Sequence, residues 1–283
     1  RVTGIEPSDI GVNGCKQKKI KVYKSYFNKD ITKKIIAERG HQDVVFANNV
    51  LANIENLKDF FINVNKLLKI DGYFIIETIT LETITKSLAL EMINHEHYYY
   101  FTRNSIANLA KNTDFKLIKT IDLKLKGSSK RFILKKINSN KKNNFIKDLI
   151  KIEQFFQLKK IIEKRKSIFI KKLTYYRNKN YNIYGFGAYA GATILIYYFN
   201  LDKKLKAIFD DNKNRLGLFS PKSCIIVQNI SKIKIIHKSI LINLAWRYTK
   251  IIERRHIQNL KKFDYFINPL PLLKVKKIVV KKN

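Results

Sequence analysis

The residues Asp43-Val44-Val45-Phe46-Ala47-Asn48-Asn49 give the clearest indication of the fold class. The first five form a nearly continuous apolar run, which is typical of a strand in a parallel sheet. Apolar residues at helical spacing follow over 57–68, and Asp71-Gly72 predicts a turn. The next strand, at 73–76, ends in Glu77. This alternation of strand and helix indicates a doubly wound α/β sheet.

The segment before this strand continues the alternation. We expect strands at 1–6 and 20–24 and helices at 7–19 and 30–39, with Asp30 suited to the N-cap of the second helix. In open α/β sheets, ligands bind outside the carboxyl ends of the strands. The polar side chains expected at such ends are Glu6, Asn48, Asn49 and Glu77.

The stretch Asn94-His95-Glu96-His97-Tyr98-Tyr99-Tyr100 contains two of the chain's five histidines. Imidazole is the side chain best suited to take a proton near neutral pH, and a neighbouring carboxylate orients it. Tyrosine rings suit a pocket that stacks a ring-shaped substrate. The alternative is a polar connection between a helix and a strand, with packed tyrosines. Because this stretch follows the helix after Glu77, it is expected near the same sheet edge.

The second half of the chain predicts a further α/β unit. A helix is expected at 104–111, then an antiparallel pair at 115–125 and 131–136, and then a long amphipathic helix from about 141 to 177. The predicted domains are 1–137, a connecting helix over 138–180, and 181–283. In the last of these, Gly185-Phe186-Gly187-Ala188-Tyr189-Ala190-Gly191 follows a strand and precedes a helix. Glycines there let backbone amides approach a phosphate, although the spacing is not the dinucleotide fingerprint.

Composition sets the remaining limits. The 283 residues are 45% hydrophobic and carry 57 Lys and Arg against 22 Asp and Glu, giving a net charge of +35. A basic surface suits nucleic acid, but the lysines are spread along the chain, so we expect no nucleic-acid partner. Compositional drift and a basic cleft for an anionic small molecule both stay open. No apolar run is long enough for a membrane span, and two distant cysteines, Cys15 and Cys224, favour the cytoplasm and offer no metal site.

Eight short segments, in order, resemble the sugar C-methyltransferase family, whose members use S-adenosylmethionine and act on nucleotide-linked keto-sugars. They are Gly4–Ser8, Ala47–Ala52, Asn94–His97 with Tyr100-Phe101, Gly127–Arg131, Tyr184-Gly185, Asp210 with Asn212 and Gly217, Leu244–Trp246, and Phe266-Ile267 with Pro269–Pro271. The resemblance covers nearly the whole chain. It implies a partial Rossmann-like class I methyltransferase sheet, a long helix and a second Rossmann-like α/β domain.

Several positions depart from the family pattern: Asn94 stands for Tyr, Asn53 for His, Tyr189 for Lys and Arg247 for Asn, and Gly127–Arg131 replaces Gly-Gly-Ser-Leu-Arg. The family's first strand and glycine-rich cofactor loop would precede Gly4, and its cysteine-rich zinc-binding domain would come earlier still. We therefore expect the sequence to be an N-terminally truncated member, inactive alone.

The resemblance implies methyl transfer to carbon in a nucleotide-linked 4-keto-deoxysugar. His97 corresponds to the base that forms the enolate, Glu96 to its orienting acid and His95 to a supporting polar group. Glu6 and Asn49 are expected to bind the cofactor, although Asn49 equally suits a backbone turn. The residues expected at the substrate are Glu77, Tyr100, Ser128, Arg131, Tyr184, Asp210 and Trp246, of which the last three equally suit packing or turns. A non-catalytic binding domain and a basic nucleic-acid-binding protein are the alternatives.

Overall fold

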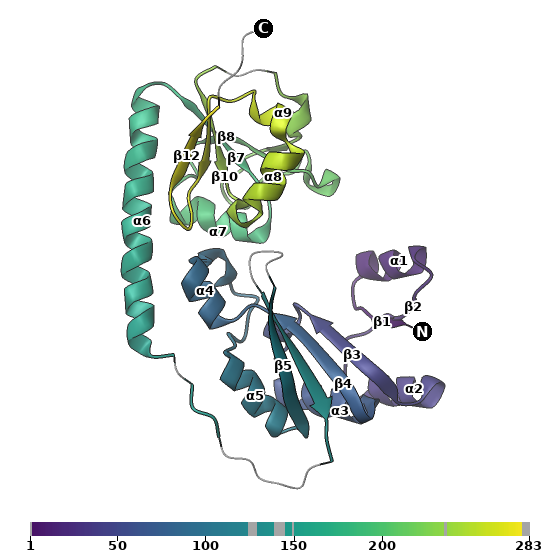
Figure 1. The fold of residues 1–283 in the computed structure, drawn as a ribbon. Helices are drawn as coiled ribbons and strands as arrows, with labels where there is room; N and C mark the ends of the chain where they lie inside the picture. The colour runs from purple at the N-terminus through teal and green to yellow at the C-terminus, as the bar shows by residue number, and fades with distance from the viewer. Residues whose placement is uncertain (1, 124–128, 139–144, 149, 235–236, 279–283) are drawn as a thin grey trace. The chain divides into compact units, whose positions relative to one another are not determined.

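The computed structural model describes residues 2–123, 129–138, 145–148, 150–234 and 237–278 (Figure 1). The chain divides into two compact units. The first comprises residues 1–81 and 96–149, and the second comprises residues 82–95 and 150–283. The predicted α/β fold is confirmed, with a methyltransferase-like sheet, a long helix and a second α/β sheet.

The first unit contains two sheets. A short parallel pair consists of β1 (Thr3–Ile5) and β2 (Lys21–Tyr23). The larger sheet has the order β3-β4-β6-β5, in which β3 and β4 are parallel and the other pairs antiparallel. Its strands are β3 (Gln42–Asn48), β4 (Leu68–Thr78), β5 (Phe115–Leu123) and β6 (Ser129–Lys136). The predicted turn at Asp71-Gly72 lies inside β4 instead, opposite a register shift in β3 that absorbs the irregularity.

Helices cover one face of the larger sheet. The helices of this unit are α1 (Asp9–Gln17), α2 (Lys29–Arg39), the 3-10 helix η1 (Leu51–Asn53), α3 (Leu57–Leu67) and α5 (Arg103–Lys111). Buried residues of α3 and α5, such as Phe61 and Ile106, share one core with Phe74 and Phe132 of the sheet. The N-cap of α2 is Asn28, whose side chain accepts from Asp30 N and Ile31 N, because its oxygen reaches the first-turn amides.

The strand β3 is less covered than its apolar sequence suggests. Ala47 is buried, but Val44 and Phe46 are 41% and 64% exposed. Within the described residues, β3 pairs with β4 alone, so it forms an edge of its sheet. The expectation of a strand buried on both faces therefore does not hold for β3.

The long helix begins later than predicted. The helix α6 runs over Ile152–Asn178, and residues 145–148 are not helical. Side chains of the first unit hold this segment in place: Asn108 donates to Ile146 O at 2.8 Å and accepts from Ile146 N at 2.9 Å, and Asn104 donates to Lys147 O at 2.9 Å. Because these amides satisfy the backbone groups that a helix would use, the segment stays extended.

The second unit is built on a six-stranded sheet with the order β12-β11-β10-β7-β8-β9, all parallel except β12. Its strands are β7 (Asn182–Phe186), β8 (Leu205–Phe209), β9 (Val227–Gln228), β10 (Ser239–Asn243), β11 (Tyr265–Asn268) and β12 (Lys274–Lys277). Its helices are α4 (Leu81–Ser87), η2 (Leu90–Met92), α6, α7 (Ala190–Tyr198), η4 (Lys213–Arg215), η5 (Ile230–Lys232), η6 (Trp246–Tyr248), α8 (Thr249–Arg255) and α9 (Ile257–Leu260).

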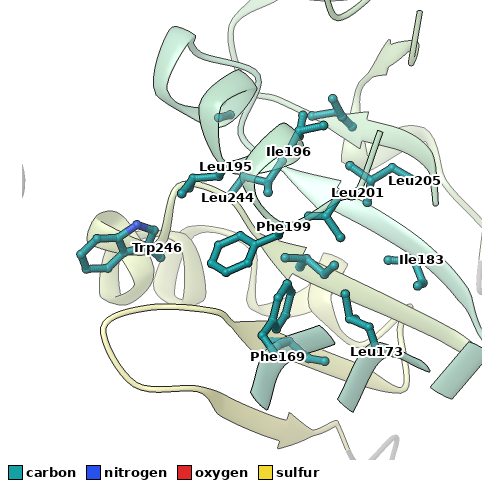
Figure 2. Close-up of a cluster of buried hydrophobic side chains, with 14 of the residues drawn as sticks. Phe169, Leu173, Ile183, Leu195, Ile196, Phe199, Leu201, Leu205, Leu244 and Trp246 are labelled. Carbon is teal, nitrogen blue, oxygen red and sulfur yellow. The ribbon is translucent and has the colours of Figure 1, made fainter. Parts of the chain in front are cut away.

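Two cores hold this sheet between helices. On one face, Phe169 and Leu173 of α6 pack with Leu195 and Phe199 around α7 and with Ile183 of β7 (Figure 2). On the other face, Phe186 and Leu241 pack with Ile252, Leu260 and Phe263 of the α8–α9 region. The residues of β7 and β10 alternate between the two cores, as the two-residue period of a strand requires.

The strand order has one reversal point. From β7 the chain continues to β8 and β9 on one side of the sheet, and it returns to β10 and β11 on the other. The carboxyl ends of β7 and β10 are therefore neighbours at the point where the strand order reverses. Ligands of open α/β sheets bind outside the sheet at such a point. In the described part of the chain, no helix is long and apolar enough to cross a membrane.

Candidate active site

At the carboxyl end of β4, two of the predicted substrate residues form a pair. Glu77 and Arg131 are direct cross-strand partners, and Arg131 Nη2 lies 3.0 Å from Glu77 Oε2. The other carboxylate oxygen accepts from Ser129 Oγ at 3.1 Å. The side chain of Glu77 is only 13% exposed, so its charge depends on these two donors. Ser128, also predicted here, lies outside the described residues.

Asn49 is adjacent to this pair through the backbone. Its N–H donates to Glu77 O at 2.7 Å, and its φ of 56° lies in the left-handed region. Asparagine tolerates that conformation better than most residues. The exposed side chain of Asn49 is thus fixed at the end of β3, beside the end of β4.

The stretch that carries His97 is anchored at the same sheet edge. Tyr98 N donates to Ala52 O at 2.8 Å, Tyr99 Oη donates to Glu55 O at 2.8 Å, and Leu81 N donates to Phe101 O at 2.8 Å. Ala52 and Glu55 follow the end of β3, and Leu81 follows the end of β4. These bonds place residues 97–101 near the strand ends that carry Asn49 and Glu77.

His97 itself is half-buried. Its ring lies edge-on to Tyr100, with 5.8 Å between the ring centroids. The Nδ1 atom is buried, and no described residue offers it a hydrogen bond. A buried ring nitrogen without a partner costs free energy, so a group outside the described protein atoms is expected to satisfy it.

The structure separates the other two predicted catalytic residues. Glu96 and His95 form an exposed turn, and the boundary between the two units falls between them. His95 belongs to the second unit, whereas Glu96 and His97 belong to the first.

Glu6 ends β1, where the sequence predicted it. Its Oε1 accepts from Ser8 N at 2.8 Å and from Ser8 Oγ at 2.6 Å, and these bonds lower the pKa of the carboxyl. A Cβ at Gly11 would come within 2.4 Å of the Glu6 side chain. Glycine at position 11 therefore leaves the space that this carboxylate occupies beside the first turn of α1.

In the second unit, Asp210 shapes the glycine loop after β7. Its Oδ2 accepts from Ala188 N at 2.6 Å and lies 3.2 Å from Arg215 Nη1, and its Oδ1 accepts from Asn212 N at 2.7 Å. Gly187 has a φ of 102°, and a Cβ there would lie 2.8 Å from Ala245 Cβ. A pocket of about 130 Å³ opens beside this loop, and its lining includes Ala188, Arg215 and Phe219.

Tyr184 and Trp246 lie in the cores of the second unit. Tyr184 stacks on Phe209 at 5.6 Å and meets Phe263 edge-on, and burial raises the pKa of its hydroxyl. Trp246 is 7% exposed, and its Nε1 is buried without a partner among the described residues.

A family model for the C-methyltransferase C-terminal domain matches residues 123–271, just over half of the chain. The chain belongs to this C-methyltransferase family. A second model, for a methyltransferase domain, matches residues 1–120. Membership in a methyltransferase family implies S-adenosylmethionine as the methyl donor.

Individual relatives of this C-methyltransferase family member are distant. The C-methyltransferase NovU of Streptomyces niveus is 23% identical over 118 residues, which are 42% of this chain and 28% of NovU. A methyltransferase from Methanosarcina mazei is 12% identical, with 49% of this chain and 82% of that protein covered, at a TM-score of 0.36. For the N-methyltransferase NodS of Bradyrhizobium japonicum the values are 12%, 49%, 74% and 0.34. Structural likeness at this level says nothing about the substrate.

Sequence reasoning missed a buried charge cluster in the second unit. Glu91, in η2, is 1% exposed, and its Oε1 lies 3.0 Å from Arg247 Nε. Burial raises the pKa of the Glu91 carboxyl, against the opposing effect of Arg247. Tyr189 is close by, and burial also raises the pKa of its hydroxyl. The only local signal was an acid inside the apolar run Leu88–Met92.

Proposed function

We propose that this chain contributes to methylation of a carbon atom beside the ketone of a nucleotide-linked 4-keto-deoxysugar, with His97 as the base. One observation carries the proposal: a half-buried histidine with an orphaned ring nitrogen lies on a segment tied to the carboxyl edge of a methyltransferase-like sheet. Membership in the C-methyltransferase family supports the same reaction.

The chemistry explains why a histidine is needed. Carbon becomes a nucleophile only after it loses a proton, and a neighbouring ketone makes that proton acidic. A histidine ring nitrogen takes the proton, and the electron pair of the broken C–H bond moves into the enolate. In this proposal substrate or an ordered water satisfies the orphaned Nδ1, and Tyr100 supports the ring from its edge.

The pair formed by Glu77 and Arg131 is suited to hold the sugar. The guanidinium donates one bond to the carboxylate, and its side chain is 40% exposed, so it retains donors for a sugar oxygen. Developing negative charge on the ketone oxygen is stabilised by such a fixed cation. We assign Arg131 this role and Glu77 the role of holding Arg131 in place.

The residues present fit the ribose of S-adenosylmethionine. The two bonds from Ser8 fall on Oε1 of Glu6, and Gly11 leaves space around the carboxylate at the end of β1. A strand-end carboxylate of this kind accepts hydrogen bonds from ribose hydroxyls. Asn49 would be a second polar contact. When bound, the cofactor supplies an electrophilic methyl group to the site.

The second unit is proposed to bind the nucleotide. Gly187 and Ala188 bring backbone close to the sheet edge at the point of strand reversal, where phosphates are commonly held. Both carboxylate oxygens of Asp210 are used within this loop, so we assign Asp210 the shaping of the loop. Arg215 and Phe219, in the lining of the adjacent pocket, offer a cation and a ring to the nucleotide.

Deuterium exchange tests the proposal without requiring methyl transfer. The chain is incubated in D2O with a nucleotide-linked 4-keto-deoxysugar, and mass spectrometry follows deuterium at the carbon beside the ketone. We expect exchange above the rate without protein, and addition of S-adenosylmethionine should yield a product heavier by one methylene. Sugar binding without exchange would instead identify a non-catalytic binding domain, and retention on nucleic acid alone would favour the nucleic-acid-binding alternative.

A further inference from the structure

Residues 82–95 make an unusual excursion along the chain. They belong to the second unit, although the residues on both sides, up to 81 and from 96, belong to the first. Ala89 is fully buried in the core that contains Phe199 and Trp246. Leu88 packs with Leu158 and Ile162 of α6. The segment that leads directly into His95-Glu96-His97 is therefore an integral part of the second unit.

Within this segment, Glu91 makes a contact that is costly for stability. Its side chain is 0% exposed and that of Arg247 is 9% exposed, so both charges have lost most of their water. Although Oε1 and Nε are 3.0 Å apart, neither carboxylate oxygen nor Nε has a partner with hydrogen-bond geometry in the described residues. A buried pair with unsatisfied atoms is often no more stable than apolar residues of similar volume.

A directional contact of this kind does specify position. The side chain of Glu91 packs against the start of α7, because a Cβ on Gly191 would lie 2.9 Å from its Cγ. Arg247 follows β10 at the strand-reversal point. The pair thus fixes η2 to two loops of the second sheet, at one register along the chain. Apolar packing alone tolerates small shifts of register better than a charged pair does.

The His97 stretch is held at both ends as a result. On its C-terminal side, Tyr98 and Tyr99 bond to residues that follow β3 in the first unit. On its N-terminal side, the closest fixed charge is that of Glu91. Few residues separate these anchors, so a slip of one register at η2 is passed to His97 through the covalent chain.

From this arrangement we infer that Glu91 and Arg247 are positioning residues, which set the register of the segment that carries His97. The inference rests on the proposed function for its catalytic consequence, but the register itself is independent of any reaction. When the pair is intact, Met92 N donates to Ala89 O and Ile93 N donates to Leu90 O, and these bonds report the local order.

Amide hydrogen exchange tests the inference directly. In the double variant Glu91→Leu/Arg247→Met we expect the melting temperature to stay near that of the wild type, because no charge is left unpaired. Exchange at the amides of Met92 and Ile93 should rise roughly tenfold, within the range of coupling energies for contacting residues. Deuterium uptake into the sugar should fall, and Arg247→Lys, which keeps the charge, should restore part of both.

A matched control removes another glutamate pair of the second unit. Glu253 lies 3.0 Å from Lys276, and Glu253→Leu/Lys276→Met should leave both readouts at the wild-type level. Wild-type exchange at Met92 and Ile93 in the Glu91/Arg247 double variant would overturn the inference. Faster amide exchange in a protein whose wild type takes no proton from the sugar would refute the proposed function and leave the register role standing.

Discussion

Replacement of Arg247 by methionine should destabilise the protein in a pH-dependent manner. The change leaves the carboxyl of Glu91, with a 0% exposed side chain, without the cation 3.0 Å away. Removal of one partner from a buried ion pair typically costs about 3–5 kcal/mol. We expect a loss of this size for Arg247→Met near pH 8, where the carboxyl must either stay charged in the interior or take up a proton.

The dependence on pH follows from the sign of the pKa shift. Burial raises the pKa of Glu91 in the folded state, and Arg247 opposes that rise. Without Arg247 the folded-state pKa lies further above the unfolded value of about 4.3. The stability contribution of such a group is fully present below the unfolded pKa and is lost as the pH rises through the folded pKa. The cost of Arg247→Met should therefore be small at pH 4.5 and grow toward pH 8.

Urea unfolding followed by circular dichroism at several pH values measures this effect. The double variant Glu91→Leu/Arg247→Met is the control, since it carries no charge at either position and should recover most of the lost stability. A cost for Arg247→Met that is below about 0.5 kcal/mol at pH 8, the range of ordinary surface changes, would refute the reasoning. A cost of the same size at every pH would show that lost packing, not the buried carboxylate, is responsible.

Two further predictions concern backbone geometry. Gly187→Ala should lower stability by about 1–3 kcal/mol in a thermal melt, because φ is 102° and the new Cβ would lie 2.8 Å from Ala245 Cβ; an unchanged melting temperature would contradict the loop geometry. Asn108→Ala should cost about 1–3 kcal/mol, because it leaves the N–H and C=O of Ile146 without their side-chain partners. Protease cleavage near residue 146 should also become faster, and cleavage at the wild-type rate would show that other contacts hold that segment.

Local sequence patterns were sufficient for most of the fold. The apolar run at 43–47, the helical spacing over 57–68 and the strand that ends in Glu77 appear as β3, α3 and β4, because each pattern is set by burial of one segment against the sheet. The glycine loop after β7 also lies between strand and helix as predicted. The predicted domain limits of 1–137, 138–180 and 181–283 stay predictions, as do the assigned roles of the site residues.

Features that depend on distant partners could not be predicted. The helix α6 starts at Ile152 because Asn108, far away in the sequence, bonds to Ile146. The pairing of Glu91 with Arg247 likewise has no local pattern, since it depends on how η2 packs against the loops of the second sheet. In contrast, the proximity of Glu77 and Arg131 follows from strand register once β4 and β6 are known to pair.

The most direct test of the account is the rate at which His97→Ala removes the proton beside the ketone. In D2O, with a nucleotide-linked 4-keto-deoxysugar and no S-adenosylmethionine, we expect deuterium uptake to fall about 10²–10⁴-fold, the usual contribution of a general base. His95→Ala, at an exposed position in the same turn, is the matched control and should lose much less. Uptake by His97→Ala at the wild-type rate would show that another residue, with Glu96 the first to examine, removes the proton.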